Sequence, residues 1–139
     1  MITISTVKLT DAFESFEMAS KLSMSFDVTG MHQLNDFERV VVNGQSIFLI
    51  ANLNGLATGY LYGNTHYAFY AAREIAWIEE LFVLEEYRGK GIARALIKQA
   101  ESIAIQRDAV LISVATRRAE LFYEKFGYER SAQYFRKLL

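Results

Sequence analysis

The spacing of hydrophobic residues changes along the chain. In the first third of the chain, this spacing predicts a strand followed by helices. Residues 2–9 alternate in polarity and are rich in β-formers, which predicts a strand. Thr10 or Asp11 is a candidate N-cap for the helix that follows. A second helix is predicted from Met31 to Val42, with a stop at Asn43-Gly44. The apolar positions that recur at helical spacing in these two segments are Phe13, Phe16, Ala19, Leu22, Leu34, Phe37, Val41 and Val42.

The middle of the chain shows the period of strands instead. Three strands are predicted, over residues 46–51, 55–63 and 73–83. The sequence Asn-Leu-Asn-Gly at 52–55 is typical of a hairpin turn between the first two. The pattern alone does not assign residues 64–72.

The last third returns to a helical period directly after two glycines. The apolar face of this predicted helix consists of Ile92, Leu96, Ala100, Ile103 and Ala104. Residues 109–115 then predict a buried strand, residues 118–126 a helix that ends at Gly127, and residues 128–139 a last strand. This order, with hairpins first and helical crossovers later, predicts a mixed sheet with helices on both faces.

The composition is that of a folded domain without a strong charge. The 139 residues are 52% hydrophobic with a net charge of −1, so we expect a single domain over residues 1–139. The near-neutral charge provides no general field for nucleic acid or an anionic membrane. We see no signal peptide and no apolar run near the roughly 20 residues that span a bilayer. We therefore expect a cytoplasmic protein that binds neither nucleic acid nor membranes.

Cysteine and histidine usage argues against several kinds of site. The chain has no cysteine, which excludes a disulfide framework, a thiolate nucleophile and a thiolate metal ligand. Its two histidines, His32 and His66, have no partner at metal-ligand spacing, so no metal site is expected. No Ser-His-Asp arrangement can be inferred from them either.

The most informative stretch is Glu85 to Ala100, where Gly89 and Gly91 stand among basic residues just before a helix. A helix N-terminus presents unpaired backbone N–H groups and a partial positive charge, and glycine lets an anion approach that backbone closely. The stretch is therefore a candidate phosphate cradle, with Arg88 and Lys90 adding positive charge at its mouth. The alternative is a turn with solvated charges and a glycine at the helix start.

Other nucleotide-binding motifs fit this stretch poorly. It contains no G-x-x-x-x-G-K-[ST] sequence, and its glycine spacing is not G-x-G-x-x-G. It loosely echoes the RNP1 pattern of RNA-binding domains, but that pattern needs aromatic residues for base stacking where Lys90 and Ile92 stand. An RNA-binding site is therefore rejected.

The sequence YRGKGIARALI at residues 87–97 resembles motif A of the GNAT superfamily of N-acetyltransferases, [RQ]-x-x-G-x-[GA], through Arg88, Gly91 and Ala93. About thirty residues later, AELFYEKFGY at 119–128 is similar to the family's A-x-x-F-Y-E-K-x-G-F signature. The resemblance covers nearly the whole chain, because the order of elements also matches. It implies a three-layer α+β fold, with a mixed, mostly antiparallel central sheet of about six strands and helices on both faces.

The resemblance also implies a function, which is acetyl transfer from acetyl-coenzyme A to a primary amine without a covalent acyl-enzyme. The backbone of Leu81, Phe82 and Val83 would line the pantetheine arm, and one of its N–H groups would polarise the thioester carbonyl. The pyrophosphate would be held by the backbone of Arg88, Gly89, Lys90, Gly91, Ile92 and Ala93, together with Arg94. In this interpretation the glycines keep side chains out of the path of the phosphates. Thr116 stands where the family often has an asparagine that contacts coenzyme A, and it can make part of that contact.

An amine must lose a proton before it attacks, because its pKa lies near 10, so a general base is expected. Glu79 and Glu80 are the candidates. Strand alternation predicts that Glu79 shares a face with Leu81 and that Glu80 shares the other face with Ile78 and Phe82. Between two apolar layers, burial would raise a carboxyl pKa toward a useful value. Family members with a glutamate base often have it at the position of Glu79, so the resemblance favours Glu79. For at least one of the two, the alternative is a solvated carboxylate at a strand end.

Tyr123 matches the tyrosine that, in the family, lies beside the thioester sulfur, which implies a general acid for the departing thiolate. The alternative is a core aromatic residue, since Leu121, Phe122 and Phe126 surround it in the sequence. A phenol with a pKa near 10 can donate a proton at neutral pH.

The acceptor is a small-molecule or peptide amine that the sequence does not identify. An aromatic-rich stretch is predicted mostly as core or sheet surface, with an acceptor pocket as the alternative; its members are Tyr60, Tyr62, Tyr67, Phe69, Tyr70 and Trp77. The family often forms dimers, so a homodimer is possible. The alternative function is a non-catalytic module that binds acyl-coenzyme A.

Overall fold

The computed structural model describes residues 1–23, 26 and 33–139. Its helices are α1 (Ala12–Leu22), α2 (Gln33–Val42), α3 (Ile92–Gln106) and α4 (Glu120–Lys125). Its strands are β1 (Ile2–Thr6), β2 (Ser46–Leu53), β3 (Leu56–Ala68), β4 (Arg73–Val83) and β5 (Ile112–Val114). The predicted start of the second helix, at Met31 and His32, lies outside the described residues.

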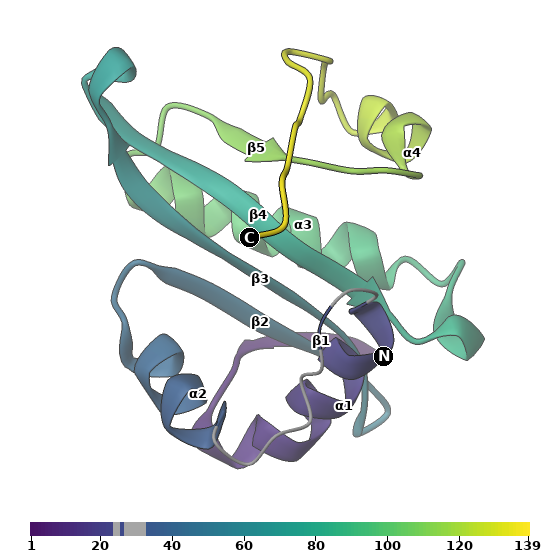
Figure 1. The fold of residues 1–139 in the computed structure, drawn as a ribbon. Helices are drawn as coiled ribbons and strands as arrows, with labels where there is room; N and C mark the ends of the chain where they lie inside the picture. Colours follow the sequence, from purple (N-terminus) through teal and green to yellow (C-terminus); the bar gives the residue numbers. More distant parts are fainter. Residues whose placement is uncertain (24–25, 27–32) are drawn as a thin grey trace.

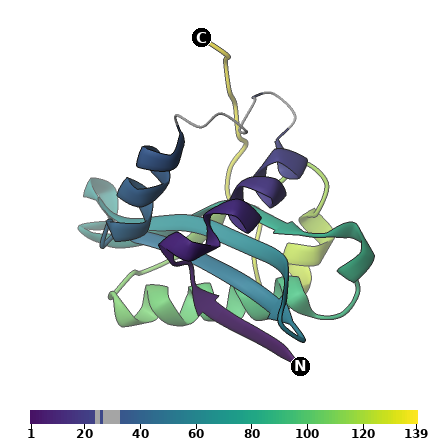
Figure 2. The same ribbon diagram turned by 90° about the horizontal axis from the view of Figure 1, so that it is seen from below.

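The strands form one mixed sheet in the order β1-β2-β3-β4-β5 (Figure 1). The first four strands pair antiparallel, and β5 pairs parallel to β4. Helices lie on both faces of this sheet (Figure 2). The predicted three-layer architecture is thus confirmed, with five strands among the described residues in place of about six.

The first of the two hairpins in the middle of the sheet follows the turn chemistry of the sequence. Asn54 and Gly55 have φ values of 52° and 86°, the left-handed conformation that a two-residue hairpin turn requires. The predicted hairpin between β2 and β3 is therefore confirmed. The unassigned residues 64–72 continue β3 to Ala68 and then form a short turn of 3₁₀-helix, Phe69–Ala71, before β4.

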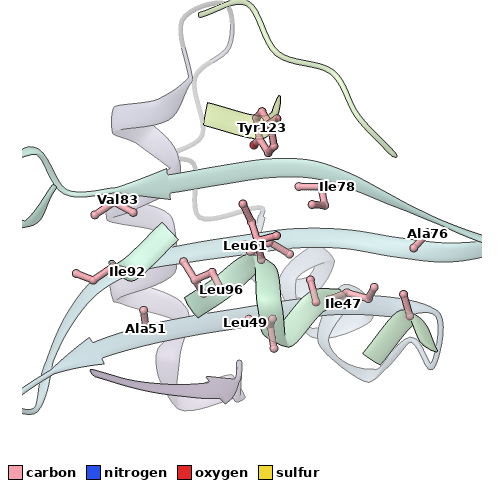
Figure 3. Packing of buried hydrophobic residues seen from close by; sticks show 13 residues of the cluster. Ile47, Leu49, Ala51, Leu61, Ala76, Ile78, Val83, Ile92, Leu96 and Tyr123 are labelled. Atoms are coloured by element: carbon pink, nitrogen blue, oxygen red, sulfur yellow. The ribbon is translucent and has the colours of Figure 1, made fainter. Parts of the chain in front are cut away.

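One face of the sheet is covered by α3 and α4. The apolar face predicted for α3 is buried, with Leu96 and Ala100 both at 0% exposure. These side chains pack against Leu49 and Leu61 from the sheet, and Tyr123 of α4 joins them at the edge of the cluster beside β4 (Figure 3). Each fully buried leucine contributes about 1.5–3 kcal/mol.

The opposite face carries α1 and α2, which form a second, smaller core (Figure 2). Met18 from α1 and Phe37 from α2 pack over Ile50, Tyr60 and Phe82 of the sheet. Successive strand side chains point to opposite faces, so β4 supplies residues to both cores. The strand that carries the candidate base is therefore held between two apolar layers.

Two predictions for the C-terminal third are wrong. Residues 128–139 form no strand, and every residue from 129 onward is exposed. The predicted buried strand at 109–115 is reduced to Ile112–Val114, whose residues are only partly buried. Without that last strand, β5 has β4 as its single neighbour among the described strands, which explains why its residues are only partly buried. Among the helices in the described ranges, none is long and apolar enough to cross a membrane.

Candidate active site

A cleft opens where β4 and β5 separate. Their pairing ends at Ile78 and Val114, yet β4 continues to Val83. Along that remainder, the edge of β4 that faces away from β3 has no strand partner among the described residues. The cleft has a volume of about 1130 Å³ and extends from this edge to the turn before α3 and to α4. Backbone N–H and C=O groups of β4 are thus available to a ligand.

The turn from β4 into α3 forms one end of the cleft. Gly89 and Gly91 have φ values of 78° and 86°, which residues with a Cβ rarely adopt. A Cβ at either position would meet nothing within 4 Å, so the space beside both glycines is open. Gly91 precedes the first turn of α3 without a side-chain cap. The first N–H groups of α3 therefore lack intrahelical partners beside an open space lined by Gly91, Ile92 and Ala93.

Two arginines are positioned at this end. The Nε of Arg88 donates a hydrogen bond of 2.9 Å to the carbonyl of Val83, and its guanidinium lies 5.7 Å from the centre of the Phe82 ring. The guanidinium of Arg94 lies 5.4 Å from the centre of the Phe126 ring. These contacts orient both positive charges along the cleft wall.

A β-bulge in β4 includes one of the two candidate bases. The pairing with β3 passes from Tyr62–Glu80 directly to Gly63–Ile78, so Glu79 is the extra residue. A Cβ at position 63 would collide with the carbonyl oxygen of Trp77, which explains the glycine opposite the bulge. The bulge changes which side chains share a face of the strand. Ile78 packs with Leu81 in the core on the α3 side, whereas Glu80 points to the other side, so the prediction that Glu80 shares a face with Ile78 is wrong. Simple alternation fails across an inserted residue.

Glu80 is held by a buried tyrosine. The hydroxyl of Tyr60 donates a hydrogen bond of 2.6 Å to Oε1 of Glu80, and Tyr60 is only 1% exposed. Burial, and then the charge of Glu80, raise the pKa of Tyr60. The phenol therefore stays protonated and remains a donor to the carboxylate.

Glu79 lines the cleft and is more exposed than Glu80. Its pKa is raised above its ordinary value, first by partial burial and then by the negative charge of Glu80, while His66 acts in the opposite direction. A carboxylate with a raised pKa is a stronger base when it is ionised. Glu79 is thus an exposed carboxylate at the cleft with a pKa above its ordinary value.

Tyr123 is nearly buried, at 7% exposure, and still lines the cleft. Its ring packs against Phe122 and Tyr128, with centroids 5.2 and 5.6 Å away. Burial raises the pKa of Tyr123 to about 12. The ring is part of the core, as the alternative interpretation predicts, and the residue also borders the cleft.

Thr116, in the loop after β5, also lines the cleft. Its Oγ1 accepts a hydrogen bond of 3.0 Å from the backbone N–H of Ala119, at the start of α4. The hydroxyl thus orders the loop before α4, and its own proton is still available for a further contact.

The structure brings the sequence-predicted site residues together, with one exception. Lys90 is exposed and does not line the cleft. Those that do line it are Glu79, Glu80, Leu81, Phe82, Val83, Arg88, Gly89, Gly91, Ile92, Ala93, Arg94, Thr116 and Tyr123. Sequence reasoning missed the basic residues Lys21, Arg117, Arg118 and Arg136 and the α1 residues Ala19 and Leu22. Only the pair Arg117-Arg118, next to Thr116, offered a signal in the sequence.

The aromatic-rich stretch divides into two groups. Tyr60 is core, as expected for most of the stretch, but Tyr67, Phe69 and Tyr70 are exposed around the turn between β3 and β4. None of its six members is among the described residues that line the cleft. An aromatic acceptor pocket is therefore not formed by these side chains here.

A family model of the acetyltransferase (GNAT) domain matches residues 44–130. An uncharacterized N-acetyltransferase from Archaeoglobus fulgidus is 29% identical over 75 residues, which cover 53% of this chain and 51% of that protein. The chain spans about half the length of this relative and of two other curated relatives that it matches.

Solved structures match over the whole chain. A transcriptional regulator from Bacillus halodurans superposes with a TM-score of 0.88 at 21% identity, with 100% of each chain covered. A glucosamine-6-phosphate N-acetyltransferase from Arabidopsis thaliana gives a TM-score of 0.88 at 16% identity, covering 99% of this chain and 98% of that one. At these identities the two structures show a shared fold.

Proposed function

The chain belongs to the GNAT acetyltransferase family, and from this premise we propose that it transfers the acetyl group of acetyl-coenzyme A to a primary amine by direct attack. The observation that supports this most is the convergence of three features on one cleft. These are the glycine turn before α3, the carboxylates at the bulge of β4, and Tyr123 of α4.

The residues at the basic end fit the pyrophosphate of acetyl-coenzyme A. The free N–H groups at the start of α3 and the open space beside Gly89 and Gly91 suit a phosphate oxygen. Arg88 and Arg94 would add charge-assisted hydrogen bonds or long-range attraction from the cleft wall. Lys90, at the exposed mouth of the turn, would contribute through its charge alone.

Acetyl-coenzyme A would supply an acetyl group that is already activated as a thioester. The unpaired edge of β4, from Leu81 to Val83, would align its pantetheine arm, and one N–H of that edge would polarise the carbonyl. Only alternate residues of a strand direct their N–H groups to the same side, so at most two of these three contribute. Positioning and backbone polarisation would then account for most of the rate enhancement.

Two side chains would carry out the proton transfers of the reaction. Glu79 would accept a proton from the amine, directly or through a water molecule, and Glu80 would face the bound cation from its fixed position on Tyr60. Tyr123 would give its proton to the departing thiolate, and its raised pKa keeps that proton in place at neutral pH. The products are an amide and the free thiol of coenzyme A.

Solved relatives are named for different acceptors, including glucosamine 6-phosphate, the alanine of a ribosomal protein and aminoglycosides. We therefore propose an amine acceptor without choosing among sugars, antibiotics and peptides. The two carboxylates at the bulge favour acceptors that arrive as cations.

Thiol release tests this proposal with little background, since the protein has no cysteine of its own. Purified protein is mixed with acetyl-coenzyme A and a panel of amino sugars, aminoglycosides, polyamines and peptides, and a thiol reagent reports free coenzyme A. We expect release that depends on one class of amine, together with binding of acetyl-coenzyme A by calorimetry. Binding without release by any amine would favour the non-catalytic module, and absence of binding would refute the proposal.

A further inference from the structure

We infer that a small cavity beside the cleft, hereafter the side cavity, binds an anionic group of the acceptor. The amine that is acetylated then also carries a phosphate or a carboxylate. This inference names the class of acceptor and therefore rests on the acetyl transfer proposed above.

The side cavity has a volume of about 460 Å³ and lies between the loop after β5 and the segment that follows α4. Its lining residues are Thr116, Arg117, Gln133, Tyr134, Phe135 and Arg136. Three of them, Thr116, Arg117 and Arg136, also line the cleft, so the two spaces adjoin. A ligand in the cleft can therefore extend a group into the side cavity.

The walls of the side cavity carry positive charge. They contain the guanidinium groups of Arg117 and Arg136, and no aspartate or glutamate is among the described residues that line it. Arg136 has an interaction partner within the chain, whereas no hydrogen bond or ion pair joins the side chain of Arg117 to another described residue. A guanidinium binds a phosphate or a carboxylate through two parallel N–H bonds, so at least Arg117 can bind an anion without giving up a partner.

The register of the sheet places the side cavity near the carboxylates of the bulge. β5 runs parallel to β4, and their last pair is Ile78 with Val114. The next two residues of β4 are the two candidate bases, and the third residue after Val114 is Arg117. The glycine turn, in contrast, comes only after the end of β4 at Val83. The side cavity thus begins at the level of the carboxylates and not at the level of the glycine turn.

The donor cannot fill the side cavity from its proposed position. All phosphates of acetyl-coenzyme A lie at the end of the pantetheine arm that is remote from the thioester, and the glycine turn before α3 would hold them there. While α3 covers one face of the sheet, Glu80 with its partner Tyr60 and the segment after α4 lie on the face that carries α1 and α2 (Figure 2). The side cavity is therefore available to the acceptor.

The two charged parts of the site describe a zwitterionic acceptor. The amine, as a cation, would lie beside Glu79 and Glu80, and the anionic group would lie beside Arg117 and Arg136. The aromatic residues of the side cavity would cover the part of the acceptor that joins the two groups. A polyamine would instead bring a second cation against the two guanidinium groups, where like charges repel at short range. Polyamines are therefore the poorest acceptors expected from this arrangement.

Pairs of amines that differ only in the anionic group test the inference. The pairs are O-phosphoethanolamine with ethanolamine, glucosamine 6-phosphate with glucosamine, and β-alanine with its amide, and putrescine serves as the dication. Thiol release at saturating acetyl-coenzyme A gives kcat/KM for each amine. We expect kcat/KM to be about 10- to 100-fold higher for the anionic member of at least one pair, as charge-assisted hydrogen bonds provide. The first two pairs report on a phosphate and the third on a carboxylate.

Substitutions in the side cavity assign this preference to its arginines. Arg117→Gln should reduce the ratio between the members of a pair to near one, and Arg136→Gln should reduce it as well. The matched control is Arg73→Gln, which removes the same charge from an exposed position at the start of β4, outside both spaces, and should keep the ratio. Arg117→Glu reverses the charge and should raise kcat/KM for putrescine above the wild-type value, a gain that a damaged fold cannot produce.

Equal kcat/KM for both members of every pair would overturn the inference, and so would a preference that survives both Arg117→Gln and Arg136→Gln. If no amine releases thiol, calorimetry of the same pairs with the protein, in the presence and absence of coenzyme A, separates the two proposals. Tighter binding of the anionic members that is lost in Arg117→Gln would support the side cavity as a binding site while the proposed acetyl transfer fails. Equal binding of both members, or no binding, would overturn the inference.

Discussion

The two ends of the cleft differ in charge, in construction and in how readily the sequence reveals them. At the basic end, Arg88 and Arg94 border a turn made by consecutive residues. At the acidic end, Glu79 is the extra residue of a β-bulge, and Glu80 beside it accepts a hydrogen bond from Tyr60 of the neighbouring strand. A polyphosphate can be recognised by backbone groups in one turn, whereas proton transfer needs side chains placed from several elements. The two ends of the cleft are therefore built from different parts of the sequence, so the proposed donor site and the proposed acceptor site can be altered separately.

The largest effect is expected from Gly91→Glu at the basic end. The substitution forces a side chain into a conformation with φ of 86° and puts a negative charge where a phosphate would bind. We expect acetyl-coenzyme A to bind about 10³-fold more weakly, which corresponds to ~4 kcal/mol, by calorimetry.

Gly55→Glu is the matched control for Gly91→Glu. Gly55 has the same φ of 86° and the same open surroundings, but it lies in the β2–β3 turn outside the cleft. It should lose stability to a similar degree and keep its affinity for acetyl-coenzyme A. Equal loss of binding in both variants would mean that backbone strain, rather than the phosphate site, explains the result.

The basic end and most of the sheet were predictable because their information is local. The spacing of Arg88, Gly91 and Ala93 describes one turn, and alternation describes one strand at a time. The acidic end was predictable in its residues but not in its geometry, since the bulge at Glu79 arises from how β4 meets Gly63 of β3. The predicted last strand was wrong for a similar reason. Residues 128–139 have the pattern of a strand, but a strand also requires an edge to pair with, which no local pattern specifies.

Tyr123→Phe should separate the two ends by affecting chemistry and not donor binding. The substitution keeps the ring contacts with Phe122 and Tyr128 and removes the proton that would reach the thiolate. We expect kcat to fall by about 10³-fold with an unchanged Kd for acetyl-coenzyme A. Tyr128→Phe, which removes a hydroxyl bonded to Glu101 outside the cleft, is the control and should retain its turnover. Normal turnover in Tyr123→Phe would eliminate the acid role.

Glu79→Gln should reduce kcat/KM by about 10²-fold and change its pH dependence. A general base must be ionised, so activity falls as pH drops through its pKa, and the raised pKa of Glu79 moves this loss to higher pH than for a free carboxyl group. The glutamine variant should lack that acidic limb, whereas Glu80→Gln should keep it. The pH profile at saturating acetyl-coenzyme A checks this. Loss of the limb in Glu80→Gln alone would assign the base to Glu80.

The smallest effect, and the sharpest test of the acidic end, is expected from Tyr60→Phe. This variant keeps a ring that is only 1% exposed and removes the hydroxyl that donates 2.6 Å to Glu80. We expect about a threefold to tenfold loss of kcat/KM for the amine, consistent with a net hydrogen-bond contribution of ~1 kcal/mol, and no change in the Kd for acetyl-coenzyme A.

The double variant Tyr60→Phe/Glu80→Gln decides whether Tyr60 acts through Glu80. If the tyrosine only positions the carboxylate, its removal adds nothing once the carboxylate is gone, and the two losses are not additive. Additive losses would instead mean that Tyr60 supports the core between α1 and β4 in general, in which case thermal stability should fall in parallel. The acidic end would then tolerate a displaced carboxylate, whereas at the basic end the single substitution Gly91→Glu is expected to weaken binding strongly.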